Sequence, residues 1–262
     1  MKKWLTVMLV SVLAVSLAAC GKSENKLDTI KKSGKIVLGT SADYAPYEFH
    51  KTTDGKDEIV GFDIAIAKRI ADELGVELEI QDMKFDGLLL ALNADKVDFV
   101  ISGMTPTPDR AKNVDFTNIY YTAEQGVLVK KENAGSFHSF DDLKGKKIAV
   151  QKGSIQEGIA KEIEGAKLTS LSKISELVLE LTSGRVDAVI AEKPVTELYA
   201  KNRSDIALAD VVVPGDEEGG SAIALKKKNK PLVDEVNKVL DEMKQDGSLD
   251  QYIIDANELV GE

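Results

Sequence analysis

Helical and strand-like hydrophobic patterns alternate along the chain. Apolar side chains at positions 64, 67, 70, 71 and 74 recur at helical spacing before Gly75, which predicts a helix over 62–74. This alternation is typical of α/β proteins with largely parallel sheets and helices on both faces. Further helices are predicted over residues 27–32, 88–93, 155–163, 231–246 and 249–254. Apolar runs predict strands over residues 34–39, 76–80, 97–101, 125–129, 145–150, 207–213 and 221–225.

One part of this pattern occurs twice. Residues 88–102 align with residues 177–191 without a gap, and each copy reads as a helix, a polar turn and a strand. Both strands carry the sequence Val-Asp-x-Val-Ile. The opening strands at 34–37 and 146–150 also correspond. The chain therefore predicts two similar Rossmann-like α/β lobes.

Polar residues follow several of the predicted strands. Ligands of α/β sheets bind outside the carboxyl ends of the strands, so two facing lobes would bring four such ends to one cleft. Arg110 and Glu192 would then supply a cation and an anion, a polarity that suits a zwitterion. The alternative for Glu192 is a solvated loop carboxylate. The four ends comprise residues 41–44, 102–110, 151–154 and 192.

The stretch after the strand at 97–101 points most directly to a ligand. Gly103 has no Cβ and lets the backbone approach a ligand closely. Thr107 and the proline after it are typical of a helix start, which places Arg110 in the first turn. A cation there is unfavourable for the helix dipole, and an anionic ligand such as a carboxylate would justify it. The alternative is a surface turn whose arginine pairs with Asp109 or Asp115.

Two aromatic residues are candidates for a ligand wall. Tyr44 lies in the loop after the first strand, and Phe85 lies at a loop-to-helix junction, where core packing accounts for it equally well. Tyr47 and Phe49 are interpreted as loop packing. Ser154 is interpreted as a helix N-cap, because the sparse histidines offer no obvious base for a nucleophilic serine.

Composition narrows the function further. The chain has 262 residues and a net charge of −10, which argues against nucleic acid as a partner. One cysteine excludes a disulfide framework, and two histidines give little support to a transition-metal site or a Cys–His catalytic pair. We therefore expect neither a metal nor a cofactor.

Residues 1–19 are interpreted as a targeting segment. Two lysines precede an apolar stretch over 4–19 that is short for a membrane span and ends at Cys20. This resembles a bacterial lipoprotein signal peptide, in which Cys20 is acylated, for example with palmitate, and becomes the mature N-terminus. The alternative is an ordinary signal peptide with a chance cysteine. Residues 20–29 would form a tether, leaving the protein lipid-anchored on the extracellular face of the bacterial cell membrane.

Short motifs occur in a specific order over nearly the whole mature chain. They comprise Ala45-Pro46-Tyr47-Glu48-Phe49, Gly61-Phe62-Asp63, Phe85-Asp86-Gly87, residues 103–110, Asp115-Phe116-Thr117, Tyr120-Tyr121, Leu143-Lys144-Gly145-Lys146, residues 186–194 and Asp246-Gly247-Ser248. Each motif alone is weak. Together they resemble the solute-binding proteins of polar amino-acid ABC importers, bacterial solute-binding protein family 3.

The resemblance implies a periplasmic-binding-protein-like type II fold with a two-strand hinge. Lobe 1 would comprise residues 30–121 and 221–262, and lobe 2 would comprise residues 122–220. The implied function is that of a monomeric, non-enzymatic receptor, which captures an amino acid between the lobes and delivers it to an ABC permease in the membrane. The alternative is an enzyme similar to cyclohexadienyl or arogenate dehydratases, because this fold does not settle function.

The resemblance also implies how the α-groups of the ligand are held. Arg110, with the main chain at Ser102 and Thr105, would bind the α-carboxylate. Glu192 would bind the α-ammonium, where the family often has aspartate. The complete implied ligand-binding set is Ser41, Tyr44, Phe85, Ser102, Gly103, Thr105, Arg110, Gln151, Ser154 and Glu192.

At the other end of the pocket, Tyr44 and Phe85 would sandwich the ligand side chain. Ser41 replaces the aspartate that some basic amino-acid binders carry, which weakens a basic assignment. Gln151 and Glu48 favour a basic ligand, so this alternative stays open. The ligand expected from the resemblance is therefore a polar uncharged or basic amino acid.

Overall fold

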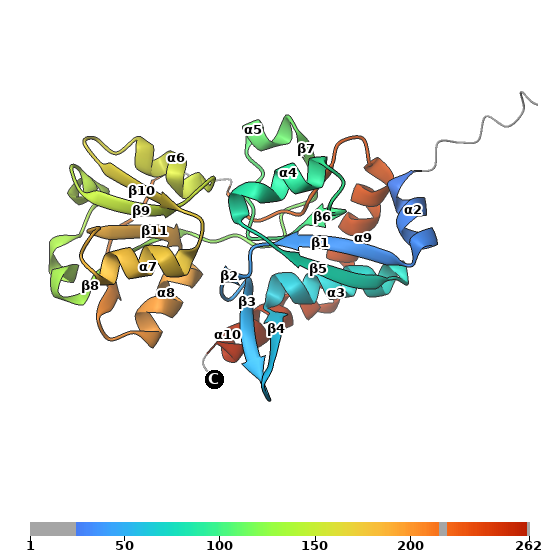
Figure 1. Ribbon diagram of the computed structural model, residues 1–262, viewed down its shortest axis with the longest axis horizontal. Helices are drawn as coiled ribbons and strands as arrows, with labels where there is room; N and C mark the ends of the chain where they lie inside the picture. Colours follow the sequence, from blue (N-terminus) through green and yellow to red (C-terminus); the bar gives the residue numbers. More distant parts are fainter. Residues whose placement is uncertain (1–24, 215–218, 261–262) are drawn as a thin grey trace, which may run out of the picture.

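The computed structural model describes residues 25–214 and 219–260. Two α/β lobes lie side by side along the long axis, and the chain crosses between them (Figure 1). Lobe 1 denotes the part around the sheet that begins at Lys35, and lobe 2 the part around the sheet that begins at Gln125. The two-lobed α/β architecture is therefore confirmed. The signal segment and Cys20 lie outside the described residues.

The elements follow the predicted order with some additions. The helices are α2 (Lys26–Ser33), α3 (Phe62–Leu74), α4 (Leu88–Asn93), α5 (Pro108–Ala111), α6 (Ile155–Lys161), α7 (Ile174–Thr182), α8 (Lys193–Asn202), α9 (Lys230–Asp246) and α10 (Ser248–Leu259). The strands are β1 (Lys35–Thr40), β2 (Asp43–Tyr44), β3 (Glu48–Thr53), β4 (Lys56–Val60), β5 (Glu77–Asp82), β6 (Phe99–Val100), β7 (Val114–Phe116), β8 (Gln125–Lys130), β9 (Lys147–Gln151), β10 (Lys167–Leu171), β11 (Ala188–Glu192), β12 (Ile206–Leu208) and β13 (Ala224–Lys226). Among the described residues, no helix has the length and apolar character needed to span a membrane.

Each lobe contains a five-stranded mixed sheet. The strand order is β5-β1-β6-β13-β7 in lobe 1 and β10-β9-β11-β8-β12 in lobe 2. The first three strands of each sheet are parallel, whereas β13 and β8 run antiparallel to both of their neighbours. The prediction of largely parallel sheets is therefore wrong for this side of each sheet. The reason is that β8 and β13 each follow a crossing between the lobes, so they enter their sheets from the cleft and run away from it.

The predicted repeat is confirmed by the strand register. Phe99 of β6 pairs with Leu38 of β1, and the corresponding Ala188 of β11 pairs with Ile148 of β9. The copies therefore occupy equivalent positions, the third strand of each sheet.

The repeated aspartate has the same structural role in both lobes. Asp98 Oδ2 accepts the main-chain N–H of Val37 at 2.8 Å, and Asp187 Oδ2 accepts that of Lys147 at 2.8 Å. Each aspartate N–H also donates to the carbonyl of the same partner at 2.8 Å. This reciprocal pair aligns the start of each strand with its neighbour, which explains why Val-Asp recurs.

Successive residues of the central strands pack against opposite helical layers. Phe99 belongs to the core formed with α3 and α9, whereas Val100 belongs to the core formed with α4. In lobe 2, Val189 packs with α7 and Ile190 packs on the side of α6. All four side chains are buried. Both faces of each sheet are therefore covered, as expected for strands with continuous apolar runs.

Several boundaries differ from the sequence-based prediction. Strand β6 is shorter than the run at 97–101, because Asp98 pairs with its neighbour through its side chain. Strand β12 covers only the start of 207–213, β13 begins later than 221, and α10 continues beyond 254. Residues 26–29 of the predicted tether belong to α2. Strand β10 was missed because it is a half-buried edge strand, and α8 because its sequence has few apolar residues.

The two crossings between the lobes pair with each other. Tyr121 and Ser221 form an antiparallel bridge, in which the Ser221 N–H donates to the Tyr121 carbonyl at 2.7 Å. A Cβ on Gly220 would lie 2.5 Å from Ile119 Cγ2 and 2.8 Å from the Tyr121 carbonyl oxygen. Glycine at this position therefore allows the crossings to approach so closely.

A small antiparallel sheet, β2-β3-β4, extends from lobe 1 (Figure 1). The turn between β3 and β4 contains Asp54 and Gly55 with φ of 52° and 77°, the left-handed conformation that a tight hairpin turn requires. The opposite end of this sheet carries Tyr44 and Glu48, which pair across β2 and β3. The hairpin thereby places the residues after β1 at the cleft.

Candidate functional site

Residues from both lobes enclose a small cavity at the carboxyl ends of the strands. It includes nine of the ten residues proposed from the sequence, all except Ser41. Its volume is about 10 Å³, close to the space that one water molecule requires. The lobes are therefore closed here, and the site must widen to admit a larger ligand. The cavity is lined by Tyr44, Phe85, Ser102, Gly103, Thr105, Arg110, Gln151, Ser154, Ile155, Gln156 and Glu192.

Arg110 reaches the cavity from the single helical turn α5. As the sequence predicts, Thr107 caps this turn, and its Oγ1 accepts the Arg110 N–H at 3.3 Å. The guanidinium donates to the Thr105 carbonyl at 2.7 Å and, across the cleft, to the Gly153 carbonyl at 2.8 Å. It also lies over the ring of Phe85, 5.4 Å from the ring centroid. Arg110 thus contacts both lobes through neutral groups.

No carboxylate among the described residues forms an ion pair with Arg110, and burial lowers its pKa to about 10. The alternative partners are engaged elsewhere, because Asp109 pairs with Lys112 at 2.6 Å and Asp115 with Lys227 at 3.0 Å. The alternative of a surface arginine paired with either aspartate is therefore wrong. A desolvated cation bonded to carbonyl oxygens retains the capacity to bind an anion.

Gly103 bends the loop after β6 toward the cavity. Its φ of 51° lies in the left-handed region, and a Cβ would lie 3.4 Å from the rings of Tyr44 and Tyr47. The Gly103 N–H donates to Asp63 Oδ2 at 2.9 Å. This N–H is therefore committed to the protein, and the close approach that glycine permits is to aromatic rings.

Glu192 ends β11 inside the cleft and is only 5% exposed. The hydroxyl of Tyr47 donates to its carboxylate, and the Glu192 N–H donates to the hydroxyl of Tyr44 at 3.1 Å. Burial, together with the charge of Glu192, raises the pKa of both tyrosines well above its ordinary value, so they remain protonated. The alternative of a solvated loop carboxylate is therefore wrong.

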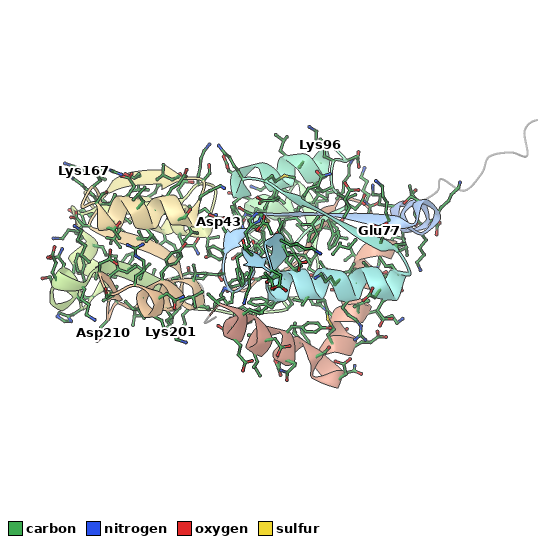
Figure 2. All side chains as sticks on the ribbon, turned by 60° about the horizontal axis from the view of Figure 1, so that its bottom comes forward. Asp43, Glu77, Lys96, Lys167, Lys201 and Asp210 are labelled. Carbon is green, nitrogen blue, oxygen red and sulfur yellow. The ribbon has the colours of Figure 1, made fainter. Side chains whose placement is uncertain are left out.

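Two further contacts join the lobes. Asp43 Oδ2, on lobe 1, accepts the N–H of Ile174, the first residue of α7, at 2.6 Å. Asp86 pairs with Lys152 at 2.8 Å. Figure 2 shows Asp43 on the side of lobe 1 that faces lobe 2. Burial raises the pKa of Asp43 to about 6, which marks a carboxylate that has lost much of its water.

Ser41 lies beside the cavity rather than on its wall. Its N–H donates to Ser102 Oγ at 3.3 Å, and its hydroxyl donates to Asp43 Oδ1 at 3.3 Å. Glu48 is fully buried and does not line the cavity. Asp43, two positions after Ser41, is therefore the acid that faces the other lobe, whereas Glu48 does not.

The residues predicted from lobe 2 come from the loop after β9. Gln151 Nε2 donates to the Ser172 carbonyl at 3.3 Å. Ser154 caps α6, since its Oγ accepts the Glu157 N–H at 3.2 Å, as the sequence predicts. Both residues border the cavity next to Phe85, which is 8% exposed.

Sequence reasoning missed three residues of the cleft: Tyr47, Ile155 and Gln156. Asp43 lies within the predicted strand end 41–44 but was not proposed to bind the ligand. Tyr47 was interpreted as loop packing, and its buried ring does pack, but its hydroxyl also reaches the other lobe. The signal that could have found it is a tyrosine, rather than a phenylalanine, three positions after Tyr44 in a strand-end loop. Gln156 follows the Ser154 cap and bonds to Gln125 at 2.6 Å.

This geometry agrees with the comparison with known families. Residues 36–254 match the bacterial extracellular solute-binding proteins, family 3, and the chain belongs to this family. It is a solute-binding protein of the amino-acid ABC transporter class.

Individual relatives cover nearly the whole chain. The arginine-binding extracellular protein ArtP of Bacillus subtilis is 44% identical over 256 residues, 96% of either chain. The amino acid ABC transporter substrate-binding protein AbpA of Streptococcus pneumoniae, solved bound to L-arginine, is 43% identical with a TM-score of 0.86, over 90% of this chain and 99% of that one. The ancestral amino-acid-binding protein AncCDT-1, a precursor of cyclohexadienyl dehydratase, is 40% identical with a TM-score of 0.78, over 86% and 96%. The relatives ArtP and AncCDT-1 are thus named as binding proteins.

We predict that Tyr47→Phe lowers the free energy of unfolding by about 1.5–3 kcal/mol, the range for a hydrogen bond to a charged group. The substitution keeps the ring contacts with Phe62 and Tyr121 and removes the hydroxyl that contacts Glu192. Urea unfolding followed by circular dichroism measures the difference.

Tyr121→Phe is the matched control, because no hydrogen bond to the Tyr121 hydroxyl is found within residues 25–214 and 219–260. It should change the free energy of unfolding by less than about 0.5 kcal/mol. Equal losses in the two variants would contradict a specific contact between Tyr47 and Glu192.

Proposed function

We propose that the cavity binds an amino acid by clamping its α-carboxylate and α-ammonium between Arg110 and Glu192. The observation that carries this proposal is the desolvated guanidinium of Arg110, which has no carboxylate partner among the described residues. Arg110 lies on lobe 1 and the buried Glu192 on lobe 2, so a zwitterion would bridge the lobes. The proposed site further comprises Ser41, Tyr44, Phe85, Ser102, Gly103, Thr105, Gln151 and Ser154.

The ligand proposed here is basic, with L-arginine as the first candidate. ArtP is named for arginine binding, and AbpA was solved with L-arginine. In this chain the negative charge for the ligand side chain would come from Asp43, two residues after Ser41. Asp43 forms no ion pair in the described part of the chain, although the charge of Lys173 is near enough to lower its pKa slightly. A guanidinium would therefore relieve a carboxylate that burial disfavours.

A second cavity offers room for this side chain. It has a volume of about 200 Å³ and is bordered by residues of both lobes, Asp43 and Asp82 from lobe 1 and Lys173 from lobe 2. It also includes Ser41, whose N–H bonds to Ser102 on the wall of the first cavity. The Ser41–Ser102 contact thus lies between the two cavities.

Calorimetric titration with L-arginine and L-citrulline tests this assignment, because citrulline is similar in length but carries no side-chain charge. We predict that the wild type prefers arginine by about tenfold or more, equivalent to about 1.4 kcal/mol. Asp43→Asn keeps an oxygen for the Ile174 N–H and removes the charge, so it should abolish the preference and leave citrulline binding unchanged.

Asp82→Asn is the matched control for this experiment. Asp82 borders the same cavity, but its side chain accepts the Ala42 N–H at 2.9 Å and lies 3.4 Å from His50. An unchanged preference in Asp43→Asn would contradict the role of Asp43. Failure of the wild type to bind any amino acid would contradict the proposed function itself.

The closed cavity requires that the lobes open to exchange ligand. In the proposed motion, lobe 1 (residues 30–121 and 221–262) and lobe 2 (residues 122–220) rotate about the two crossings. The bridge between Tyr121 and Ser221 supports this role, because it keeps the crossings together while each lobe retains its own sheet.

The chain is proposed to act as a receptor rather than an enzyme. The dehydratase alternative is supported by the similarity to AncCDT-1, which is itself named an amino-acid-binding protein. Glu192 opposite Arg110 suits an amino acid better than a keto acid, because a keto acid offers no ammonium to a buried carboxylate. Delivery of the amino acid to an ABC permease would complete the function.

The proposed site of attachment is Cys20, which would hold the receptor by its acyl chains on the extracellular face of the cell membrane. The lipoprotein-like pattern around Cys20 supports this, as does membership of the bacterial extracellular solute-binding proteins, family 3. We predict that cells supplied with labelled palmitate label the wild type and not Cys20→Ser, while the purified variant binds L-arginine like the wild type. Equal labelling of both proteins would contradict attachment at Cys20.

A further inference from the structure

Two carboxyl groups that the proposed binding step does not use lie behind the loop after β6. Glu48 begins β3 and Asp63 lies in the first turn of α3, and both residues are 0% exposed. Neither lines the cavity. Burial of a carboxylate is costly unless the group is hydrogen-bonded or holds a proton.

Both carboxyl groups accept hydrogen bonds from this loop. The Ser102 hydroxyl donates to Glu48 Oε1, and the Gly103 N–H donates to Asp63 Oδ2 at 2.9 Å. The same Asp63 oxygen accepts the hydroxyl of Tyr120 at 2.9 Å. Because Tyr120 immediately precedes the first crossing, one oxygen atom connects the binding loop to the hinge.

The other two oxygens of the pair have no donor from elsewhere. Within the described residues, no N–H or O–H group reaches Glu48 Oε2 or Asp63 Oδ1. The two acids are neighbours behind the loop, because their other oxygens accept hydrogen bonds from the adjacent residues Ser102 and Gly103. A proton between the two unpaired oxygens would satisfy both of them. Burial raises the pKa of both groups, and the nearby Asp63 raises that of Glu48 further. Asp63 Oδ2 accepts two hydrogen bonds, which favour its charged form, whereas Glu48 Oε1 accepts one, so Glu48 is the group that holds the proton.

We propose that Glu48 and Asp63 share one proton and act as positioning residues for the amino-acid site. The proton lies between Glu48 Oε2 and Asp63 Oδ1, so the pair carries one negative charge instead of two. A second charge behind the carboxylate end of the cleft would repel the ligand's own carboxylate. The positioning role rests on the proposed function, whereas the shared proton does not.

The pair determines which groups the loop presents. Because the Ser102 hydrogen is directed to Glu48, Ser102 Oγ is an acceptor for the Ser41 N–H at 3.3 Å. Asp63 holds the Gly103 N–H in the left-handed turn. Glu48 and Asp63 thereby hold the loop from the side away from the cavity. Neither acid lines the cavity itself.

Substitutions at Glu48 test the shared proton, with L-arginine as the calorimetric probe. Glu48→Ala leaves the Ser102 hydroxyl and Asp63 without their partner, and we expect about tenfold weaker binding or more. Glu48→Gln should rescue binding, because its amide N–H replaces the shared proton. The double variant Glu48→Gln/Asp63→Asn sets two amide NH₂ groups against each other and should weaken binding again.

Thr40→Val is the matched control, since Thr40 Oγ1 is buried without a hydrogen-bond partner in the described residues. It should bind L-arginine like the wild type. The proposal is overturned if Glu48→Gln fails to fold or binds as weakly as Glu48→Ala. It is equally overturned if the double variant binds as well as Glu48→Gln.

Unfolding provides a second test that needs no ligand. Because the pKa of Glu48 is raised in the folded protein, unfolding releases its proton, and the free energy of unfolding falls as the pH rises toward that raised value. Glu48→Gln should therefore release about one proton fewer on unfolding, measured from the pH slope between about pH 7 and the raised pKa of Glu48. An unchanged slope overturns the shared proton, whereas a wild type that binds no amino acid overturns only the proposed function.

The neighbouring titratable groups do not obscure this slope. Tyr44 and Tyr120 face the pair and remain protonated, because burial raises the pKa of each well above its ordinary value. Asp43 also faces Glu48, but its pKa of about 6 leaves it ionised above pH 7. The difference between the wild type and Glu48→Gln therefore reports the pair.

Discussion

The partial burial of Arg110 is the constraint on which the cleft depends. A guanidinium removed from water needs partners, and the two lobes supply the carbonyl oxygens of Thr105 and Gly153. Carbonyl oxygens satisfy N–H donors but do not neutralise the charge. A ligand carboxylate would do so, and the ammonium of the same ligand would then meet Glu192 across the cleft. The proposed recognition therefore divides two opposite charges between two lobes, so that neither lobe alone forms the site.

Closure of the lobes rests on polar contacts that are each modest in free energy. Tyr47 contacts Glu192, and Asp43 accepts the N–H of Ile174, so groups desolvated by closure find partners in the opposite lobe. A hydrogen bond to a charged group contributes about 1.5–3 kcal/mol net, which leaves the balance between open and closed forms adjustable by a ligand. Binding that engages both lobes would shift this balance toward the closed form.

Local signals explain what the sequence predicted. The turn that carries Arg110 was predicted from Thr107 and its following proline, both within one short stretch. The cross-lobe contacts could not be predicted in the same way, because Tyr47 and Glu192 are 145 positions apart and Asp43 and Ile174 are 131 apart. The antiparallel direction of strands β8 and β13 could not be predicted for a related reason, since it depends on where the chain crosses between the lobes.

The most direct test of the zwitterion clamp is calorimetric titration of the wild type and Arg110→Ala with L-arginine, its decarboxylated analogue agmatine and its deaminated analogue. In the wild type, both analogues should bind at least about 30-fold more weakly than arginine, since loss of one partner of a buried charge pair costs about 2–5 kcal/mol. In Arg110→Ala, arginine and agmatine should bind with similar affinity, because the carboxylate no longer meets a cation. Tight binding of the deaminated analogue by the wild type, or near-native affinity of Arg110→Ala for arginine, would contradict the clamp.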